Sequence, residues 1–247
     1  MIRLLCLILA ALPAWGQYIG ALPFVVSGGG GGGITPIAST GAQAASGFPL
    51  TVTTPSSTFN GTGANAIFAA VATVSGVTGT VTDSSGNTYA AVNLPTSPQG
   101  AYSNPGEITL YCTFNPTVTS NMTFTYLSGT ISAPAMGVLG VAGLGGCSVD
   151  QTNGLPEPAG GTSTQPGSIT PTQNNEIWIA VCQTTNAVTD APSSNIGTLV
   201  YQAAFSSGIA FSIGMYYGIQ TTATAVNPTF SWDITSQNIS AIWSFEQ

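Results

Sequence analysis

Short segments rich in Val, Ile, Thr, Phe and Tyr recur along the chain from Phe48 onward, and clusters of Gly, Pro, Asn and Ser separate them about every eight to twelve residues. β-Branched and aromatic residues favour extended backbone, whereas the separating residues favour turns. Apolar residues do not recur at the three- and four-residue spacing of an amphipathic helix over any window of about eleven residues. The pattern predicts an all-β fold, an antiparallel β-sandwich of many short strands.

The predicted strands form two sets that resemble an internal repeat, since 65–71 aligns with 175–181 and three later segments align in the same order. We therefore expect two pseudo-repeated halves, about 57–146 and 165–247, joined by a long connection over 145–175. They would be either two immunoglobulin-like domains or one continuous sandwich, and we favour one body because 135–142 and 176–183 are apolar on both faces. The first set is 67–73, 78–83, 88–92, 108–114, 122–127 and 135–142, and the second is 176–183, 199–203, 209–219, 229–233 and 239–245.

The first 16 residues have the order of a secretory signal peptide, with a basic start at Arg3, an apolar stretch over 4–12, and a cleavage site before Gln17. The apolar stretch is too short for a membrane-spanning helix, which needs about 20 residues; the alternative is an uncleaved anchor or a buried start of the fold. Residues 17–46 include a run of consecutive glycines and are predicted to form a flexible lead-in to a body at 47–247. We expect a secreted or cell-surface protein without membrane insertion.

Cleavage before Gln17 leaves no basic side chain, because the chain lacks histidine and Arg3 is its one Lys or Arg. Binding of nucleic acid or of an anionic membrane surface requires Lys and Arg, so neither partner is expected. The absence of His and Lys also excludes Ser–His–Asp, Cys–His and Ser–Lys nucleophiles, pyridoxal phosphate chemistry and histidine-bound metals. We predict that the protein is not an enzyme and has no catalytic residue, cofactor or metal.

The absence of His and Lys does not exclude catalysis by carboxylates, since a glycoside hydrolase needs only two Asp or Glu residues. No two carboxylates form a locally spaced pair, so a carboxylate-pair glycoside hydrolase is a further alternative only. The turn over 83–87 could offer oxygen ligands to calcium but lacks the acidic density of a calcium loop, and we expect it to be a hairpin tip. The eight carboxylates are Asp83, Glu107, Asp150, Glu157, Glu176, Asp190, Asp233 and Glu246.

Aromatic side chains could bind a glycan by stacking. Strand alternation places Trp178 and Trp243 in the core. Tyr89, Tyr102 and Tyr201 lie in a loop or at the ends of hairpin segments, and they are the candidate glycan-binding residues. A carbohydrate-binding module is therefore the main alternative function, with an extracellular glycan or another surface protein as the expected partner.

Three cysteines follow the predicted cleavage site: Cys112, Cys147 and Cys182. Their spacing fits no zinc motif, while export would permit a disulfide. Two interpretations remain open, one disulfide among the three with one free thiol, or three buried thiols.

Five motifs of the chain belong together: the strand 65–71, the D-S-x-G-N-T-Y segment 83–89, the L-Y-C strand 110–112, the connector 149–153 and the Q-P-G-S-I-T-P segment 165–171. These motifs resemble those of a recurrent family of uncharacterised bacterial secreted β-sandwich proteins. The resemblance covers about 57–247 and implies an immunoglobulin-like or jelly-roll sandwich on an exported protein, with no known reaction. Together with the composition, it leads us to expect a non-catalytic extracellular structural or adhesive module.

Overall fold

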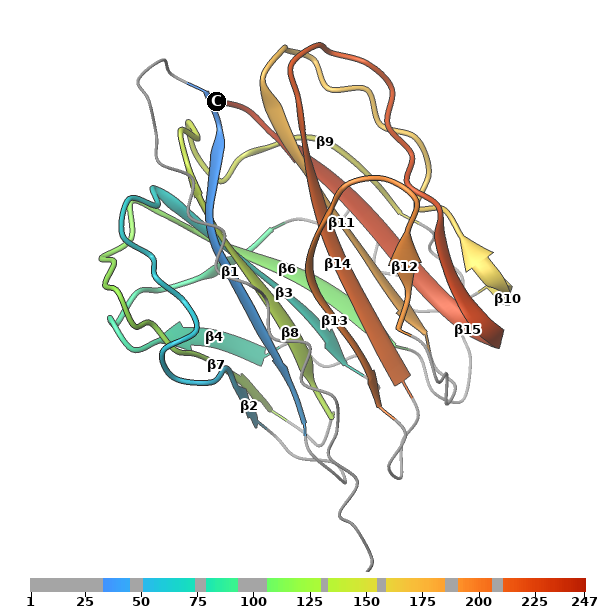
Figure 1. The fold of residues 1–247 in the computed structure, drawn as a ribbon, viewed down its shortest axis with the longest axis horizontal. Coiled ribbons are helices and arrows are strands. Elements are labelled where there is room, and N and C mark those ends of the chain that lie inside the picture. Colours follow the sequence, from blue (N-terminus) through green and yellow to red (C-terminus); the bar gives the residue numbers. More distant parts are fainter. Residues whose placement is uncertain are drawn as a thin grey trace, which may run out of the picture.

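The computed structural model describes residues 33–44, 51–73, 79–92, 106–129, 133–154, 159–184, 191–205 and 211–247. The regular elements in these ranges are all strands, and every pairing between them is antiparallel (Figure 1). The prediction of an all-β protein with antiparallel sheets is confirmed, and the arrangement is consistent with a sandwich. Within the described ranges, no helix has the length and apolar character needed to cross a membrane. The predicted signal peptide lies outside these ranges.

The first large sheet has the strand order β1-β8-β3-β6-β5. Its central strand β3 is buried along its whole length, as expected for the uninterrupted apolar sequence AIFAAVAT. A smaller sheet, β2-β7-β4, covers one face of it, with Phe59 and Phe124 packed edge to face at 4.8 Å in the core between them. The strands are β1 (Thr35–Gln43), β2 (Thr51–Thr53), β3 (Ala66–Thr73), β4 (Gly79–Asp83), β5 (Ala90–Ala91), β6 (Glu107–Phe114), β7 (Phe124–Ser128) and β8 (Ala135–Ala142).

The second large sheet has the order β10-β15-β11-β14-β13, and β9 and β12 also pair with β15. Strand β15 is 16 residues long, and pairs first with β10 and β12 and then with β11 and β9. Phe230 and Trp232, in its first part, pack in one apolar cluster with Trp178 of β11. The strands are β9 (Val149–Gly154), β10 (Ala159–Thr164), β11 (Glu176–Thr184), β12 (Ser193–Ser194), β13 (Thr198–Phe205), β14 (Phe211–Gln220) and β15 (Phe230–Phe245).

The two large sheets face each other across one apolar core, which we call the central core. Alternate residues of β3, such as Phe68, and of β11, such as Ile179, point into it. Phe68 also packs against Phe245 of β15, with 4.6 Å between ring centroids. The central core therefore takes side chains from both predicted halves, and truncation of a buried ring such as Phe68 to alanine would cost about 3–5 kcal/mol.

The two ends of the described chain lie next to each other, at what we call the tether end of the body. A Cβ atom on Gly143 would lie 2.6 Å from the carbonyl oxygen of Gly33, and one on Gly145 would lie 2.9 Å from the main-chain oxygen of Gln247. Figure 1 shows the carboxyl terminus beside the upper end of β1. The antiparallel registers place another set of strand ends at the opposite end: Gln43, Thr73, Glu107 and Ala135.

Two segments predicted to be irregular contain strands. β1 lies within the predicted lead-in 17–46, so the sheet begins earlier than expected, and β9 and β10 lie within the predicted connection 145–175. Each of these strands contains several residues of weak strand propensity, such as Gly, Ala or Asn, and pairing with β8 or β15 overcomes this weakness. The predicted strands 229–233 and 239–245 are joined in the single strand β15, which begins at Phe230.

The turn over 83–87 is present, but it is not the tip of a regular hairpin. The Asp83 carboxylate accepts hydrogen bonds from the backbone N–H groups of Ser85 and Asn87, and Gly86 has a positive φ of 79°. The strands on either side of the turn belong to different sheets, and a single bridge between Thr82 and Thr88 is the pairing recorded across it. The chain therefore crosses here from the small sheet to the first large sheet.

A disulfide joins Cys112 of β6 to Cys147 in the segment between β8 and β9, while Cys182 of β11 is a free, buried thiol. The first of the two interpretations of the cysteines is confirmed. Burial raises the pKa of the Cys182 thiol well above its usual value, so this group is a poor nucleophile. The disulfide points to an oxidising environment, in line with export.

Candidate functional site

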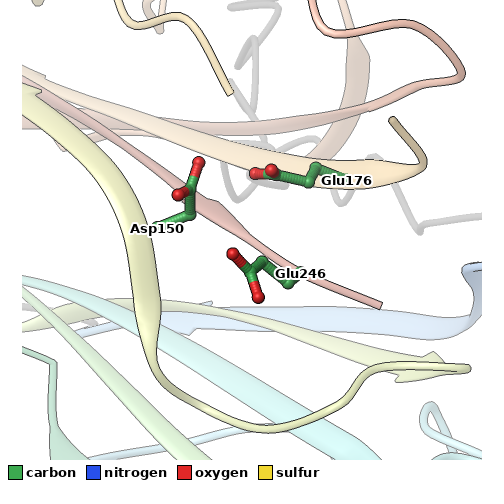
Figure 2. Close-up of side chains that lie close together, drawn as sticks. All are labelled: Asp150, Glu176 and Glu246. Carbon is green, nitrogen blue, oxygen red and sulfur yellow. The ribbon is translucent and has the colours of Figure 1, made fainter. Parts of the chain in front are cut away.

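Three carboxylates meet at the tether end. Asp150 is the second residue of β9, Glu176 is the first residue of β11, and Glu246 directly follows β15. One oxygen from each lies within 4.8 Å of the others, and Figure 2 shows the three side chains pointing toward one another. We call these residues the acidic cluster.

Strand register brings these residues together. Phe245 of β15 pairs with Val149 of β9 on one side and with Ile177 of β11 on the other. Each acidic residue is the chain neighbour of one of these three paired residues, so all three carboxylates lie at one level of the sheet. The cluster is a product of pairing between three segments that are distant in the sequence.

Asp150 is half-buried and well supplied with hydrogen-bond donors. The Thr172 hydroxyl donates to its Oδ1 at 2.7 Å, and the Thr172 backbone N–H donates to its Oδ2 at 2.8 Å. Burial raises the pKa of Asp150, but the two Thr172 donors, together with side-chain hydrogen bonds from Gln151 and Glu176, outweigh burial and leave the pKa below its usual value. Asp150 is therefore held in its ionised form.

Glu176 has the opposite environment, because its side chain has no exposed surface. The backbone N–H of Gln173 donates to its Oε1 at 2.9 Å, whereas no described donor makes a well-formed hydrogen bond to its buried Oε2. Burial raises the pKa of Glu176 and the charge of Asp150 adds to this, while the Gln173 N–H and the Ser244 hydroxyl oppose it. The net result is a raised pKa and a buried oxygen without a donor.

No side chain of the described protein can neutralise this cluster. The chain has no histidine, and its one basic side chain, Arg3, lies outside the described residues. A shared proton or an external cation are the two ways left to balance the charge. A raised and a lowered pKa side by side also resemble a general acid and its partner, but a fully buried Glu176 has no access to a substrate.

The sequence interpretation did not bring these three residues together. It placed Asp150 in a connector, Glu176 beside a strand and Glu246 near the chain end, and it found no local pair. The missing information was the register of β15 between β9 and β11, which depends on tertiary packing.

Among the other carboxylates, Asp83 uses its oxygens within the turn. Its Oδ2 accepts hydrogen bonds from the Asn87 amide at 2.8 Å and from the Tyr89 hydroxyl at 2.7 Å, in addition to the backbone bonds of the turn. This pattern supports a capped turn. Glu157 and Asp190 lie outside the described residues.

Two of the three candidate glycan-binding residues, Tyr89 and Tyr201, lie in the described part of the chain, and both are half-buried. The hydroxyl of the half-buried Tyr89 donates a hydrogen bond to the Asp83 carboxylate, and its ring packs against that of Phe124, with 6.4 Å between the ring centroids. Tyr201 is half-buried against the central core, and its ring fills the space that a Cβ atom on Gly41 would occupy. Tyr102 lies outside the described residues. A row of stacking rings is therefore not found among the described candidates.

Comparison of the chain with family models, with curated proteins and with solved structures found no match. The resemblance inferred from the sequence motifs remains a prediction. The fold is that of an all-β protein with several antiparallel sheets, and no family is identified.

Proposed function

We propose that this protein is a non-catalytic, exported structural or adhesive module. The observation that carries the proposal is that both ends of the described chain lie at the tether end of one layered β body. Any segment that precedes Gly33 or follows Gln247 is joined to the body at this end. The opposite end, with the strand ends at Thr73 and Ala135, is then turned away from the attachment point.

The chemistry of the surface suits such a role. Only 4% of the residues are charged, so hydroxyl and amide groups must supply the polar contacts of the exposed faces. Contacts of this kind are uncharged and insensitive to salt, unlike those that depend on Lys and Arg. The disulfide between Cys112 and Cys147 supports an oxidising, extracellular setting.

A glycoside hydrolase is the second candidate, because the acidic cluster does place carboxylates close together. A retaining enzyme of this class holds its two carboxyl groups about 5–5.5 Å apart, on either side of a sugar. The burial of Glu176 argues against that arrangement, since its carboxyl group has no exposed surface on which a substrate as large as a sugar could lie. We therefore place the cluster outside catalysis.

We also propose that the body consists of two pseudo-repeated halves that share one central core. Phe68 of β3 pairs with Cys112 and Leu139 on its two sides, while Ile179 of β11 pairs with Tyr217 and Trp243. All six side chains belong to the central core or pack against it. The strand orders β8-β3-β6 and β15-β11-β14 are thus equivalent.

Two isolated bridges support the same equivalence. Phe59 pairs with Met122 in the first half, and Ile169 pairs with Val226 in the second. The superposition implied by the pairings matches Phe68 with Ile179, which is one residue away from the alignment suggested by the sequence motifs. The difference arises because alternate residues of a strand point to opposite faces, and the pairings fix which face is shared.

The first half has the strand distribution of a jelly roll, the second of the two folds that the sequence resemblance implies. Successive strands β1, β2, β3 and β4 alternate between the first large sheet and the small sheet, and the same alternation returns from β6 to β8. In the second half, the first part of β15 occupies the place of β7 and its last part the place of β8. We propose two jelly-roll-like halves packed through their larger sheets.

The adhesive role is tested by attaching the protein to beads in two orientations and comparing how well the beads are retained on cells. One preparation carries biotin at its amino terminus, and the other carries biotin-maleimide on Gly129→Cys, near the end of β7 away from the tether end. Gly129 is exposed and has no heavy atom within 4 Å of an added Cβ, while the native thiol of Cys182 is buried and protected from the reagent. Retention is measured on cells of the source organism.

Amino-terminal attachment is expected to give saturable retention, and attachment through residue 129 is expected to abolish most of it. Heat-denatured protein on the same beads is the control for nonspecific adsorption. Equal retention in both orientations, or none in either, would contradict the proposal.

A further inference from the structure

We propose that Asp150, Glu176 and Glu246 bind one calcium ion at the tether end of the body. The site is independent of the adhesive or structural role proposed above. It rests on the convergence of three carboxylates on one point and on a buried oxygen for which the described residues supply no hydrogen-bond donor.

The unpaired oxygen is the first step of the argument. Glu176 has no exposed surface, its Oε2 has no well-formed hydrogen bond within the described protein, and its side chain points at Asp150 and Glu246 (Figure 2). A buried carboxylate oxygen without a donor is costly, and buried charges in proteins are paired or coordinate metals. Because the described chain contains no basic side chain, the pairing charge must come from outside it.

The spacing of the oxygens selects among divalent cations. Calcium binds oxygen at about 2.3–2.6 Å, so two oxygens on one ion are at most about 4.6–5.2 Å apart, whereas magnesium at about 2.0–2.1 Å allows at most about 4.2 Å. The oxygens lie within 4.8 Å of one another, a span that one calcium ion can bridge as they stand, whereas magnesium would require a span of no more than about 4.2 Å. Zinc prefers nitrogen and sulfur, the chain has no histidine, and Cys182, the free thiol of the described residues, lies elsewhere on β11.

The bound ion would link three strands near their ends, where fewer backbone hydrogen bonds hold them together. Asp150 is the second residue of β9, Glu176 is the first residue of β11, and Glu246 directly follows β15, so each ligand stands at or next to the end of a strand. Three protein ligands leave the remaining coordination positions to water, which is typical of weaker sites. We infer an affinity in the range of extracellular calcium modules, with a dissociation constant of about 0.1–1 mM.

Thermal unfolding with and without calcium tests the site. At about 10 mM calcium, binding to the native state alone raises the folded-to-unfolded ratio by about 10- to 100-fold, and the melting temperature by about 3–10 °C. Magnesium at equal ionic strength is expected to give a much smaller shift. Equilibrium dialysis with calcium-45 is expected to show one ion per chain.

The variants Glu176→Gln and Glu246→Gln remove one ligand each with little change of shape, and both are expected to lose the calcium shift and the bound ion. In chelator, Glu176→Gln is also expected to melt at a higher temperature than the native protein, since it no longer buries an unpaired charge. Glu246 is only half-buried and follows the last strand, so Glu246→Gln keeps the test valid if Glu176→Gln does not fold. Glu107→Gln, which removes a carboxylate of β6 outside the cluster, is the matched control and is expected to keep the full response.

The proposal is overturned if calcium leaves the melting temperature of the native protein unchanged, because the cluster then balances its charge with a proton. It is equally overturned if the calcium shift persists in both Glu176→Gln and Glu246→Gln, or if magnesium matches calcium.

Discussion

Reduction of the Cys112–Cys147 disulfide is expected to destabilise the protein by several kcal/mol. The bridge closes a loop with a sequence separation of 35 residues. For a loop of this length, the chain-entropy model gives a stabilisation of about 3.8 kcal/mol at 25 °C, because the bridge restricts the unfolded chain. For a protein of this size, each kcal/mol moves the melting temperature by about 2–4 °C, so we expect a decrease of about 8–15 °C.

The assay compares thermal unfolding of the oxidised protein with that of protein held in a phosphine reductant. Both thiols stay in place on reduction, so the change reports the covalent constraint and not lost packing. The double variant Cys112→Ala/Cys147→Ala is expected to melt slightly lower still, because Cys112 is buried and its truncation leaves a cavity, and it is expected to be insensitive to reductant. A melting temperature that changes by less than about 2 °C on reduction would refute the reasoning, since even the low end of the expected range exceeds it.

Gly41→Ala is expected to destabilise the protein by about 1–3 kcal/mol in denaturant titrations, because the new Cβ would lie 2.2 Å from the Tyr201 ring. The control is Gly160→Ala, which has open space around it and is expected to change stability by less than about 0.5 kcal/mol. In chelator, the melting temperature is expected to fall as pH rises through the raised pKa of Glu176, because the native state then binds more protons than the unfolded state, and to fall again as pH drops through the lowered pKa of Asp150. A melting temperature that rises steadily from about pH 4 to 8 would contradict that sign. Protein cleaved before Gln17 contains no Lys or Arg, so trypsin is expected to leave it whole even after denaturation, as intact-mass measurement would show.

The strands that are apolar on both faces could be predicted from the sequence with nearly their observed bounds. Residues 135–142 and 176–183 correspond to β8 and β11, and each lies between two neighbouring strands with layers on both sides. Trp178 and Trp243 are buried as the alternation of their strands predicts. Burial on both faces leaves a continuous apolar signal that needs no knowledge of the partner strands.

The strands that were missed depend on their partners. β1 has the sequence TPIASTGAQ, which resembles a linker, and it becomes a strand because β8 offers an unpaired edge along its whole length. The acidic cluster was missed for a related reason, since Asp150, Glu176 and Glu246 become neighbours only when β9, β11 and β15 pair in the observed register. Registers between distant segments are set by packing of the whole body and leave no local pattern in the chain.

The central claim is that the protein is a non-catalytic structural or adhesive module. It is tested most directly by incubating the native, calcium-loaded protein with the cell envelope of its source organism and analysing the soluble products. Mass spectrometry of the supernatant is expected to show no released sugar or peptide fragments while the protein itself is retained on the envelope. Release of fragments by the native protein, lost in Asp150→Asn, would contradict the account and identify the acidic cluster as a catalytic centre.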